Sequence, residues 1–283
     1  MTHLRVSLQP AYVLHQRAYR DTSAILELFT PEEGRVGVIA KGVRGNKPRW
    51  RGLLQAFQPL LVSWSQRGDL GLLTEAEAQG AALNINPRFI ASGFYLNEVL
   101  MRLLHRHDAQ LELFGCYDAA LRELSALGAV EVKTAANREN YAESHAESQV
   151  DSSVLIELEV ILRRFEMHLL SALGYGLVLD HDMHTAAPVQ ADQQYLYYVE
   201  HGPALADGQH DEASGLRVSG QCLLAMQADD WSADATRREA KRLLRAVLGH
   251  YLGPKPLQSR ELMQQSAQLA QRVARSEKNP VAQ

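Results

Sequence analysis

The sequence predicts an α+β protein of several domains, with an N-terminal five-stranded β-barrel followed by a mainly α-helical domain that carries a small β-insert. Short runs of β-forming residues, separated by turn residues, fill the first 80 positions of the 283-residue chain. After Pro87 the apolar residues recur every three or four positions, as on one face of a helix. A typical domain holds about 150 residues, so the length allows roughly two. We therefore expect a barrel domain over residues 1–80 and a helical domain over residues 81–283.

Five strands are expected in the N-terminal domain. Their ranges are Ala11–Arg20, Ser23–Thr30, Arg35–Gly42, Phe57–Trp64 and Asp69–Ala76. Turn residues separate them, because Gly34 can adopt the positive φ of a tight turn and Lys41–Trp50 contains glycine and proline. Five short strands in about 70 residues are typical of the OB-fold, a small closed barrel.

Helices are expected from residue 88 onward. They are Arg88–His107, a helix capped by Asp108, Val154–Leu173, Ala233–Leu252 and a last helix from Ser259 to near Ala274. Two segments interrupt this pattern. Residues 128–153 carry five acidic residues and few large apolar ones, so we expect a mobile acidic loop that serves as a solvated connection. Residues 177–222 mix β-like pieces with Gly, Pro, Asp and His, so we expect a small β-insert there.

The composition excludes several classes of protein. Lys and Arg number 29 against 33 Asp and Glu, and a net charge of −4 excludes a wholly basic nucleic-acid coat protein. The two cysteines, Cys116 and Cys222, cannot supply a disulfide framework or a four-thiolate zinc site, and they suit a reducing compartment. No apolar run approaches the ~20 residues that cross a bilayer, and Met1–Arg5 lacks the apolar region of a secretory signal. We expect a cytoplasmic protein with no membrane partner.

Positive charge is concentrated in one stretch of the barrel domain. Residues 35–68 contain seven basic residues and no Asp or Glu, which is the separation of charge that phosphate binding requires. Exposed aromatics on an OB-fold can also stack bases, and Trp50 lies between two arginines in a loop where burial is hard to arrange. The alternative is that the cations are only solvated and the aromatics fill the barrel. The predicted nucleic-acid contacts are Arg35, Lys41, Arg44, Lys47, Arg49, Trp50, Arg51 and Arg67.

A second basic run lies in the expected helix Ala233–Leu252. It comprises Arg237, Arg238, Lys241, Arg242 and Arg245, and Glu239 is the acidic residue among them. At helical spacing Arg238, Lys241, Arg242 and Arg245 share one face. This face is either a solvated surface or a groove for an acidic peptide tail or a phosphate backbone.

Signals for an enzyme are weak. The sequence contains no GxxxxGK[ST], GxSxG or HExxH motif and no GxGxxG that opens a helix, so we predict no catalytic residues and no cofactor. His181, Asp182 and His184 could bind one metal ion, but the pattern has no partner pair downstream. The alternatives to a DNA-binding protein are a metal-dependent nuclease or phosphoesterase that uses these three residues, and an RNA-binding OB-fold adaptor.

Several tracts, in their order and spacing, resemble the RecO family of bacterial recombination mediators over nearly the full length. The N-terminal tracts are Arg20–Ser23, Leu28–Thr30 with Gly34-Arg35, Ala40–Arg44, Leu54–Leu60 and Gly93–Leu100. The C-terminal tracts are Arg164–Glu166, Leu169-Leu170, Leu173–Gly176 and Gly253–Leu262.

The resemblance implies an OB-fold, a helical domain and, in many members, a zinc-binding β-insert with four cysteines. It also implies binding of single- and double-stranded DNA, strand annealing, and action with RecR and the single-stranded DNA-binding protein to load RecA during DNA repair and recombination at the nucleoid. The acidic tail of the single-stranded DNA-binding protein is then the expected ligand of the basic helical face. Asp182 stands in the region where zinc-bearing members begin their cysteine set, and Cys222 lies outside it. We therefore expect a zinc-ribbon-like insert without a metal.

Overall fold

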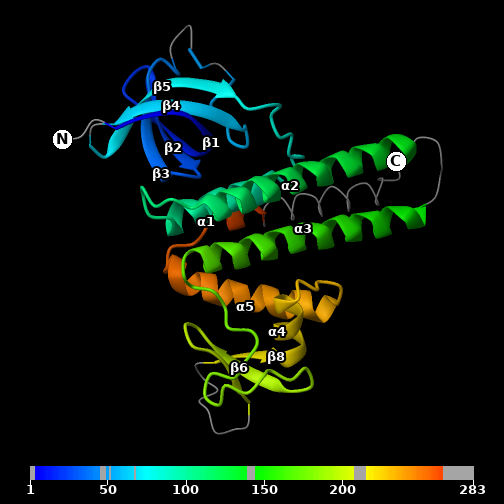
Figure 1. Cartoon of the computed structure of the whole chain (residues 1–283). Coiled ribbons are helices and arrows are strands. Elements are labelled where there is room, and N and C mark those ends of the chain that lie inside the picture. Colours follow the sequence, from blue (N-terminus) through cyan, green and yellow to red (C-terminus); the bar gives the residue numbers. More distant parts are fainter. Residues whose placement is uncertain are drawn as a thin grey trace. The chain divides into compact units, whose positions relative to one another are not determined.

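The computed structural model describes residues 4–44, 49–50, 52–66, 68–138, 144–206 and 215–263 (Figure 1). The chain divides into two compact units, Met1–Asn140 with Lys255–Gln283 and Tyr141–Pro254. The first unit holds the barrel together with helical residues that follow it in the chain, and the expected domain boundary after residue 80 stays a prediction. Among the helices in the described ranges, none is long and apolar enough to cross a bilayer.

Five strands close into the predicted barrel in the order β1-β2-β3-β5-β4. The strands are β1 (Leu4–Tyr19), β2 (Ser23–Thr30), β3 (Gly34–Ala40), β4 (Leu60–Gln66) and β5 (Leu70–Ala78). The first half of β1 pairs with β4 and its second half pairs with β2, so one long strand joins both edges of the sheet. The predicted α+β class and the N-terminal barrel are therefore confirmed, with β1 starting seven residues earlier than expected at Ala11.

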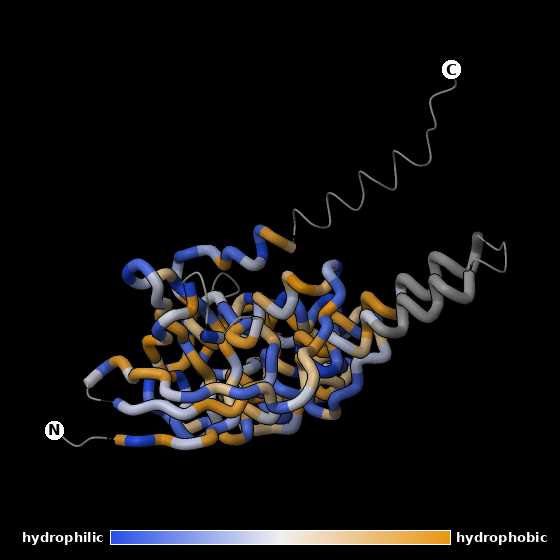
Figure 2. The backbone as a smooth tube through the Cα atoms, turned by 90° about the horizontal axis from the view of Figure 1, so that it is seen from above, coloured by the Kyte–Doolittle hydropathy of each residue, from blue (hydrophilic) through white to orange (hydrophobic). Residues whose placement is uncertain are grey.

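The barrel core is apolar, and one strand is buried on both faces. Leu26, Leu28 and Trp64 are fully buried, and every residue of β2 is buried. A strand with one solvated face alternates between apolar and polar residues, so a wholly buried strand needs a cover on its outer face. In Figure 2 hydrophobic and hydrophilic residues are interspersed along the backbone.

Two helices of the first unit provide that cover. They are α1 (Ile90–Leu103) and α2 (Leu111–Arg138), and α2 contacts β2. The ring of Phe29 lies 5.4 Å from Phe114 and 5.8 Å from Tyr117, measured between centroids. The Tyr117 hydroxyl donates to the Asn97 side chain at 2.5 Å, and Asn97 in turn donates to the Leu14 carbonyl at 3.0 Å. These contacts join both helices to the barrel.

The second unit contains two long helices, one short helix and the small sheet in its described residues. Its elements are α3 (Ser144–Ala172), β6 (Gln194–Tyr198), β7 (Gly202–Leu205), β8 (Leu216–Ser219), α4 (Gly220–Gln227) and α5 (Asp234–Leu252). The three strands pair in the order β7-β6-β8, and α5 contacts α3, α4 and β8 (Figure 1). This confirms the predicted small β-insert between helices. The short helix α4, which the sequence did not indicate, begins at Gly220 near the end of the expected insert and continues beyond it to Gln227.

The prediction of a loop over residues 128–153 is wrong for its described part. The helix α2 continues to Arg138 and α3 begins at Ser144, while residues 139–143 lie outside the described ranges. The segment lacks a strong apolar stripe, but it is rich in Ala and Glu, which have high intrinsic helix propensity. The high helix propensity of these residues therefore explains why both helices extend into a segment without hydrophobic periodicity.

Candidate nucleic-acid interface

One end of the barrel brings together two segments that carry exposed cations. Ala24 of β2 pairs with Ala40 of β3, so the turn between β1 and β2 lies beside the loop that follows β3. The backbone N–H of Arg44 donates to the Thr22 carbonyl at 3.0 Å, which holds that loop against the turn. The conformation of the turn is unusual, because Arg20 adopts a positive φ of 52°.

The predicted contacts Lys41, Arg44 and Arg49 are exposed at this end of the barrel. The side chains of Lys41 and Arg44 have no ion-pair partner in the part of the chain that the structure describes. Unpaired surface cations can neutralise phosphates without first breaking an internal interaction. The predicted contacts Lys47, Arg51 and Arg67 lie outside the described residues.

Sequence reasoning missed two further cations, Arg17 and Arg20. Both are exposed at the end of β1, and Arg17 pairs with Ile25 just before the turn. Along the sequence they are separated from Lys41 by two strands, so only the strand register brings them to the same end of the barrel. A prediction of the β1–β2 hairpin register would have been the signal that found them.

The expectation that Trp50 is hard to bury is wrong, because its side chain is only 8% exposed and belongs to the barrel core. The guanidinium carbon of Arg49 lies 4.3 Å from the centre of the Trp50 ring. Arg49 also donates to the Thr74 carbonyl at 2.8 Å. A cation above the ring face covers the indole without leaving apolar surface in water, which explains how a residue in a Gly/Pro loop becomes buried.

Arg35 lies elsewhere, at the opposite end of β3 from Ala40. The two lie five positions apart along the strand, a distance of roughly 16 Å. Its guanidinium donates to the Met101 carbonyl, and its Nε lies 3.8 Å from Glu27, whose other oxygen pairs with Arg106. Burial lowers the pKa of Arg35, the Glu27 carboxylate acts to raise it, and Arg106 acts to lower it. The structure therefore does not bring Arg35 together with Lys41 and Arg44, and it engages Arg35 in holding α1 to the barrel.

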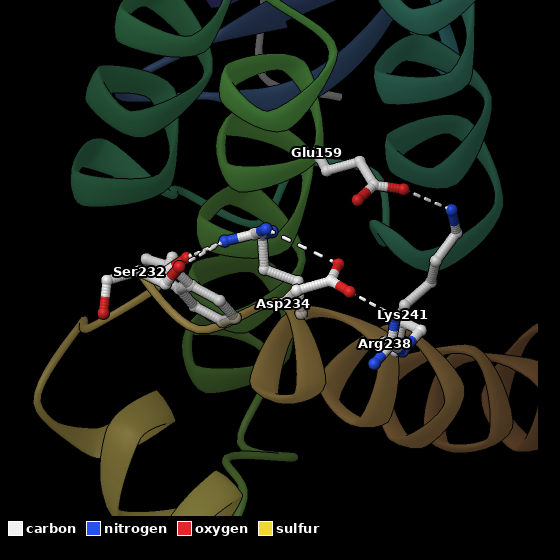
Figure 3. Close-up of polar contacts among 7 residues, drawn as sticks. Glu159, Ser232, Asp234, Arg238 and Lys241 are labelled. Carbon is white, nitrogen blue, oxygen red and sulfur yellow. Dashed lines mark hydrogen bonds and ion pairs between the residues drawn. The ribbon is translucent and has the colours of Figure 1, made fainter. Parts of the chain in front are cut away.

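The second basic run lies on α5, and Figure 3 shows the polar contacts that Arg238 and Lys241 make with Asp234 and Glu159. Arg237 is buried, and its Nη1 donates to the carbonyls of Trp231 and Ser232 at 2.6 and 2.7 Å. Arg238 pairs with Asp234 one turn earlier on the same helix. Arg237 thus fixes the start of α5 and does not belong to the exposed face.

The other members of the predicted face are exposed, but they differ in whether they have a polar partner. Lys241 pairs with Glu159 of α3 at 2.5 Å (Figure 3), and Arg242 donates to the Arg217 carbonyl at 2.5 Å. Arg245 is exposed and contacts no partner in the described ranges. Exposed ion pairs of this kind are worth only about 0–1 kcal/mol, so an acidic ligand could replace them at small cost.

An apolar surface adjoins this face. Leu155 is 44% exposed and lies four residues before Glu159, so both occupy one side of α3. The Lys241–Glu159 pair therefore places cations of α5 beside an exposed leucine of α3.

A separate pocket of about 250 Å³ lies on another side of α5. The rings of Tyr175 and Tyr251 stack there with centroids 3.9 Å apart, and Glu200 also lines the pocket. Because consecutive helical residues are about 100° apart, the lining residue Val247 and the basic residue Arg245 point in nearly opposite directions. This pocket is therefore not one that a ligand held by Arg245 would enter.

The geometry around Asp182 does not fit a metal centre. Its Oδ1 accepts hydrogen bonds from the backbone N–H groups of His184 and Thr185 and from the Thr185 hydroxyl, and its Oδ2 accepts from the N–H of Leu205 at 2.7 Å. Neighbouring His181 pairs through Nδ1 with Asp180 at 2.6 Å. Both carboxylate oxygens are thus engaged with the protein, and no three His, Cys, Asp or Glu side chains in the described ranges gather as metal ligands. The Asp182 carboxylate thus links the backbone at His184 and Thr185 to Leu205 of β7.

Comparison with known proteins matches both parts of the chain. The family model "Recombination protein O N terminal" matches residues 4–81, and "Recombination protein O C terminal" matches residues 149–261. The chain is 41% identical over 265 residues to the DNA repair protein RecO of Nitrosospira multiformis, covering 94% of this chain and 98% of that protein. It is 42% identical over 277 residues to the protein of the same name from Nitrosococcus oceani, covering 98% of this chain and 100% of the relative. The corresponding protein of Coxiella burnetii is 39% identical over 259 residues.

Proposed function

The chain belongs to the RecO family of DNA repair proteins, and we propose that it acts as a recombination mediator by binding DNA without covalent chemistry. In this proposal it binds single- and double-stranded DNA, anneals complementary strands, and works with RecR to load RecA on DNA coated by single-stranded DNA-binding protein. The observation that carries the proposal is the group of exposed cations at one end of the barrel, Arg17, Arg20, Lys41 and Arg44.

The physical basis of binding is the release of counterions from the phosphate backbone. Each phosphate that a Lys or Arg neutralises releases condensed ions, so the affinity falls steeply as salt rises. Cations that lie side by side can hold two strands at once and reduce the repulsion between their phosphates. Annealing by this means requires no nucleotide hydrolysis.

The first experiment removes two of these cations. We expect Lys41→Gln with Arg44→Gln to weaken binding of every DNA sequence alike, because phosphate contacts carry no sequence information. The slope of log affinity against log salt should fall by about 0.7 per cation for a single strand. Fluorescence anisotropy of a labelled oligonucleotide over a range of NaCl concentrations measures both quantities.

A matched control removes two exposed arginines outside this cluster. Arg122→Gln with Arg164→Gln changes the net charge by the same amount and removes exposed arginines that pair with Asp118 and Asp229. If the control weakens binding as much as the Lys41/Arg44 variant, the effect reflects net charge and the proposed interface is wrong. A single-stranded RNA of equal length tests the adaptor alternative, which tighter binding of RNA than of DNA would favour.

We further propose that the basic face of α5, Arg238, Lys241, Arg242 and Arg245, receives the acidic tail of the single-stranded DNA-binding protein. An acidic peptide with a hydrophobic end needs cations beside apolar surface. The exposed Arg245, the Lys241–Glu159 pair and the neighbouring Leu155 offer that combination. The cations should act on the association rate, and the apolar contact should set the residence time.

The substitutions in this second experiment are neutral because reversal of Lys241 would place a carboxylate beside Glu159. We expect Lys241→Gln with Arg245→Gln to weaken a synthetic acidic peptide about tenfold, a loss of ~1.4 kcal/mol. Binding of naked single-stranded DNA should change less than twofold in the same variant. If DNA binding collapses while the peptide binds normally, this face belongs to the DNA path.

A further inference from the structure

A pocket of about 370 Å³ lies in the first unit, between the second half of β1, residues 54–56 and α1. Its floor is apolar, because Val13, Leu14 and Leu54 are buried. Its rim is polar, with His15 and Gln55 exposed to solvent. The volume falls within the range of about 300–1,000 Å³ that small-ligand sites occupy.

A β-bulge helps to form this pocket. The register of β1 with β2 shifts between Val13 and His15, so Leu14 is the extra residue on β1. Its carbonyl accepts a hydrogen bond from the Asn97 side chain at 3.0 Å. Bulges redirect side chains at the rims of barrels. Here the bulge joins β1 to α1, and Asn97 lies one helical turn after Phe94, the aromatic wall of the pocket.

Phe94 is 39% exposed although its ring has an aromatic partner. Its ring lies 5.1 Å from that of Phe57, and Phe57 adopts a positive φ of 64°. The neighbouring Gly93 is required for this contact, because a Cβ there would lie 2.8 Å from the Phe57 ring. Non-glycine residues in left-handed conformations are strained and cluster at functional sites. Phe57 thus adopts a strained backbone conformation, and its ring packs against Phe94 at the mouth of the pocket.

The pocket adjoins the cations proposed to hold phosphates. His15 on its rim precedes Arg17 by two residues of β1, or roughly 7 Å, and both are exposed. On the other side, the Leu53 N–H donates to the Trp50 carbonyl at 3.1 Å, which connects the loop of Arg49 to residues 54–56. A strand whose phosphates follow these cations has its bases within reach of the pocket.

We infer that this pocket takes one unstacked nucleobase of single-stranded DNA, stacked on Phe94 with its polar edge toward His15, Gln16 and Gln55. An aromatic wall, an apolar floor and a polar rim match the flat ring and hydrogen-bonding edge of a base. Stacking on an aromatic side chain tolerates any sequence, because every base has a π-face. Bases within a duplex are already stacked, so the pocket favours single strands. This inference rests on the proposed function, since it requires that the barrel binds DNA.

The test compares an ordinary single-stranded oligonucleotide with an abasic oligonucleotide of the same length and charge. Phe94→Ala should weaken the ordinary strand about fivefold or more and leave the abasic strand and a duplex within about twofold. Phe94→Trp should restore binding of the ordinary strand, because it restores the stacking surface. Ile90→Ala is the matched control, since Ile90 is also 39% exposed on α1 but does not line the pocket.

The outcomes separate the two proposals. If wild-type protein binds no DNA at low salt, or binds it without dependence on Lys41 and Arg44, the proposed function fails first. If those dependences hold but Phe94→Ala behaves as Ile90→Ala does, the base pocket alone is wrong. Equal losses of ordinary and abasic strands on Phe94→Ala would also overturn the pocket, because they would show a change in the phosphate path.

Discussion

The carboxylate of Glu98 on α1 caps the helical turn that contains Ser259, 161 positions later in the chain. Its Oε2 accepts hydrogen bonds from the Ser259 N–H at 2.9 Å and from the Ser259 hydroxyl at 2.6 Å. Its Oε1 accepts from the N–H of Gln258 at 3.0 Å, so two free donors at the start of residues 258–263 are satisfied. A carboxylate from α1 thus satisfies backbone donors at the start of the helix that the sequence predicts from Ser259.

Loss of the charge at Glu98 should lower the free energy of unfolding. Burial acts to raise the pKa of Glu98, but hydrogen bonds from Ser259 and Gln258 outweigh it and hold the pKa below its usual range. We expect Glu98→Gln to cost about 1 kcal/mol at neutral pH, a value discounted for partial exposure. A lowered pKa contributes stability above the unfolded pKa and loses it as the pH falls through the folded pKa. Urea denaturation at neutral pH and near pH 3 should therefore show the difference between the proteins shrinking in acid.

The control for this prediction is Glu123→Gln. Glu123 is exposed on α2 and has no contact in the described ranges. Its substitution should change stability by less than about 0.5 kcal/mol, as is usual for surface positions. Equal effects of the two variants would contradict a capping role for Glu98.

Asp182→Asn should loosen the β-insert locally. Burial acts to raise the pKa of Asp182, but hydrogen bonds from Thr185, Leu205 and His184 outweigh it and lower the pKa. An amide cannot accept with both of its terminal atoms, so the variant loses acceptors for these N–H groups. We expect the amides of Leu205 and Thr185 to exchange hydrogen about tenfold faster, as measured by NMR.

The same measurement has a pH arm and a control. Because the pKa of Asp182 is lowered, the wild-type protection should persist above the ordinary carboxyl range and disappear as the pH falls through the folded pKa. Asp192→Asn changes an exposed carboxylate of the same insert and should leave these amides protected. Unchanged exchange in Asp182→Asn would show that the backbone alone holds the insert.

Trp50 should matter more for stability than for direct contact with DNA. Trp50→Ala removes a core side chain of the barrel and should cost about 3 kcal/mol. Trp50→Phe keeps a ring face beneath Arg49 and should leave DNA affinity within about twofold. Arg49→Gln should weaken DNA binding while Trp50→Phe does not. A large loss of affinity in a folded Trp50→Phe protein would indicate that the indole itself contacts a base.

The barrel strands were predictable because their signals are local. Runs of β-formers ended at glycine, proline and charged turns, and Ser23–Thr30 matches β2 at both ends. The start of β1 was not predictable in this way, because Leu4–Pro10 is mixed in polarity and pairs only with β4. Pairing with a distant strand overrides weak local preference.

The charge pattern by itself determined where to look for a nucleic-acid interface, since uncompensated cations in residues 35–68 are visible without a structure. Which of these cations lie together at one end of the barrel was decided by the tertiary structure. Strand register joins Arg17 and Arg20 to Lys41 and Arg44, while Glu27 takes Arg35 into an ion pair at the far end of β3.

The sequence alone thus determined the α+β class, the five-stranded barrel and the family, because periodicity, turn residues and ordered tracts are properties of the chain itself. Only the tertiary structure decided that Trp50 is buried, that Glu98 caps the helical turn at Ser259, and that Phe94 is exposed and lines a pocket. Each of these depends on contacts between residues far apart in the chain. Such contacts are set by packing and by the need of buried polar groups for hydrogen-bond partners. The local pattern of apolar and polar residues in the sequence reveals neither.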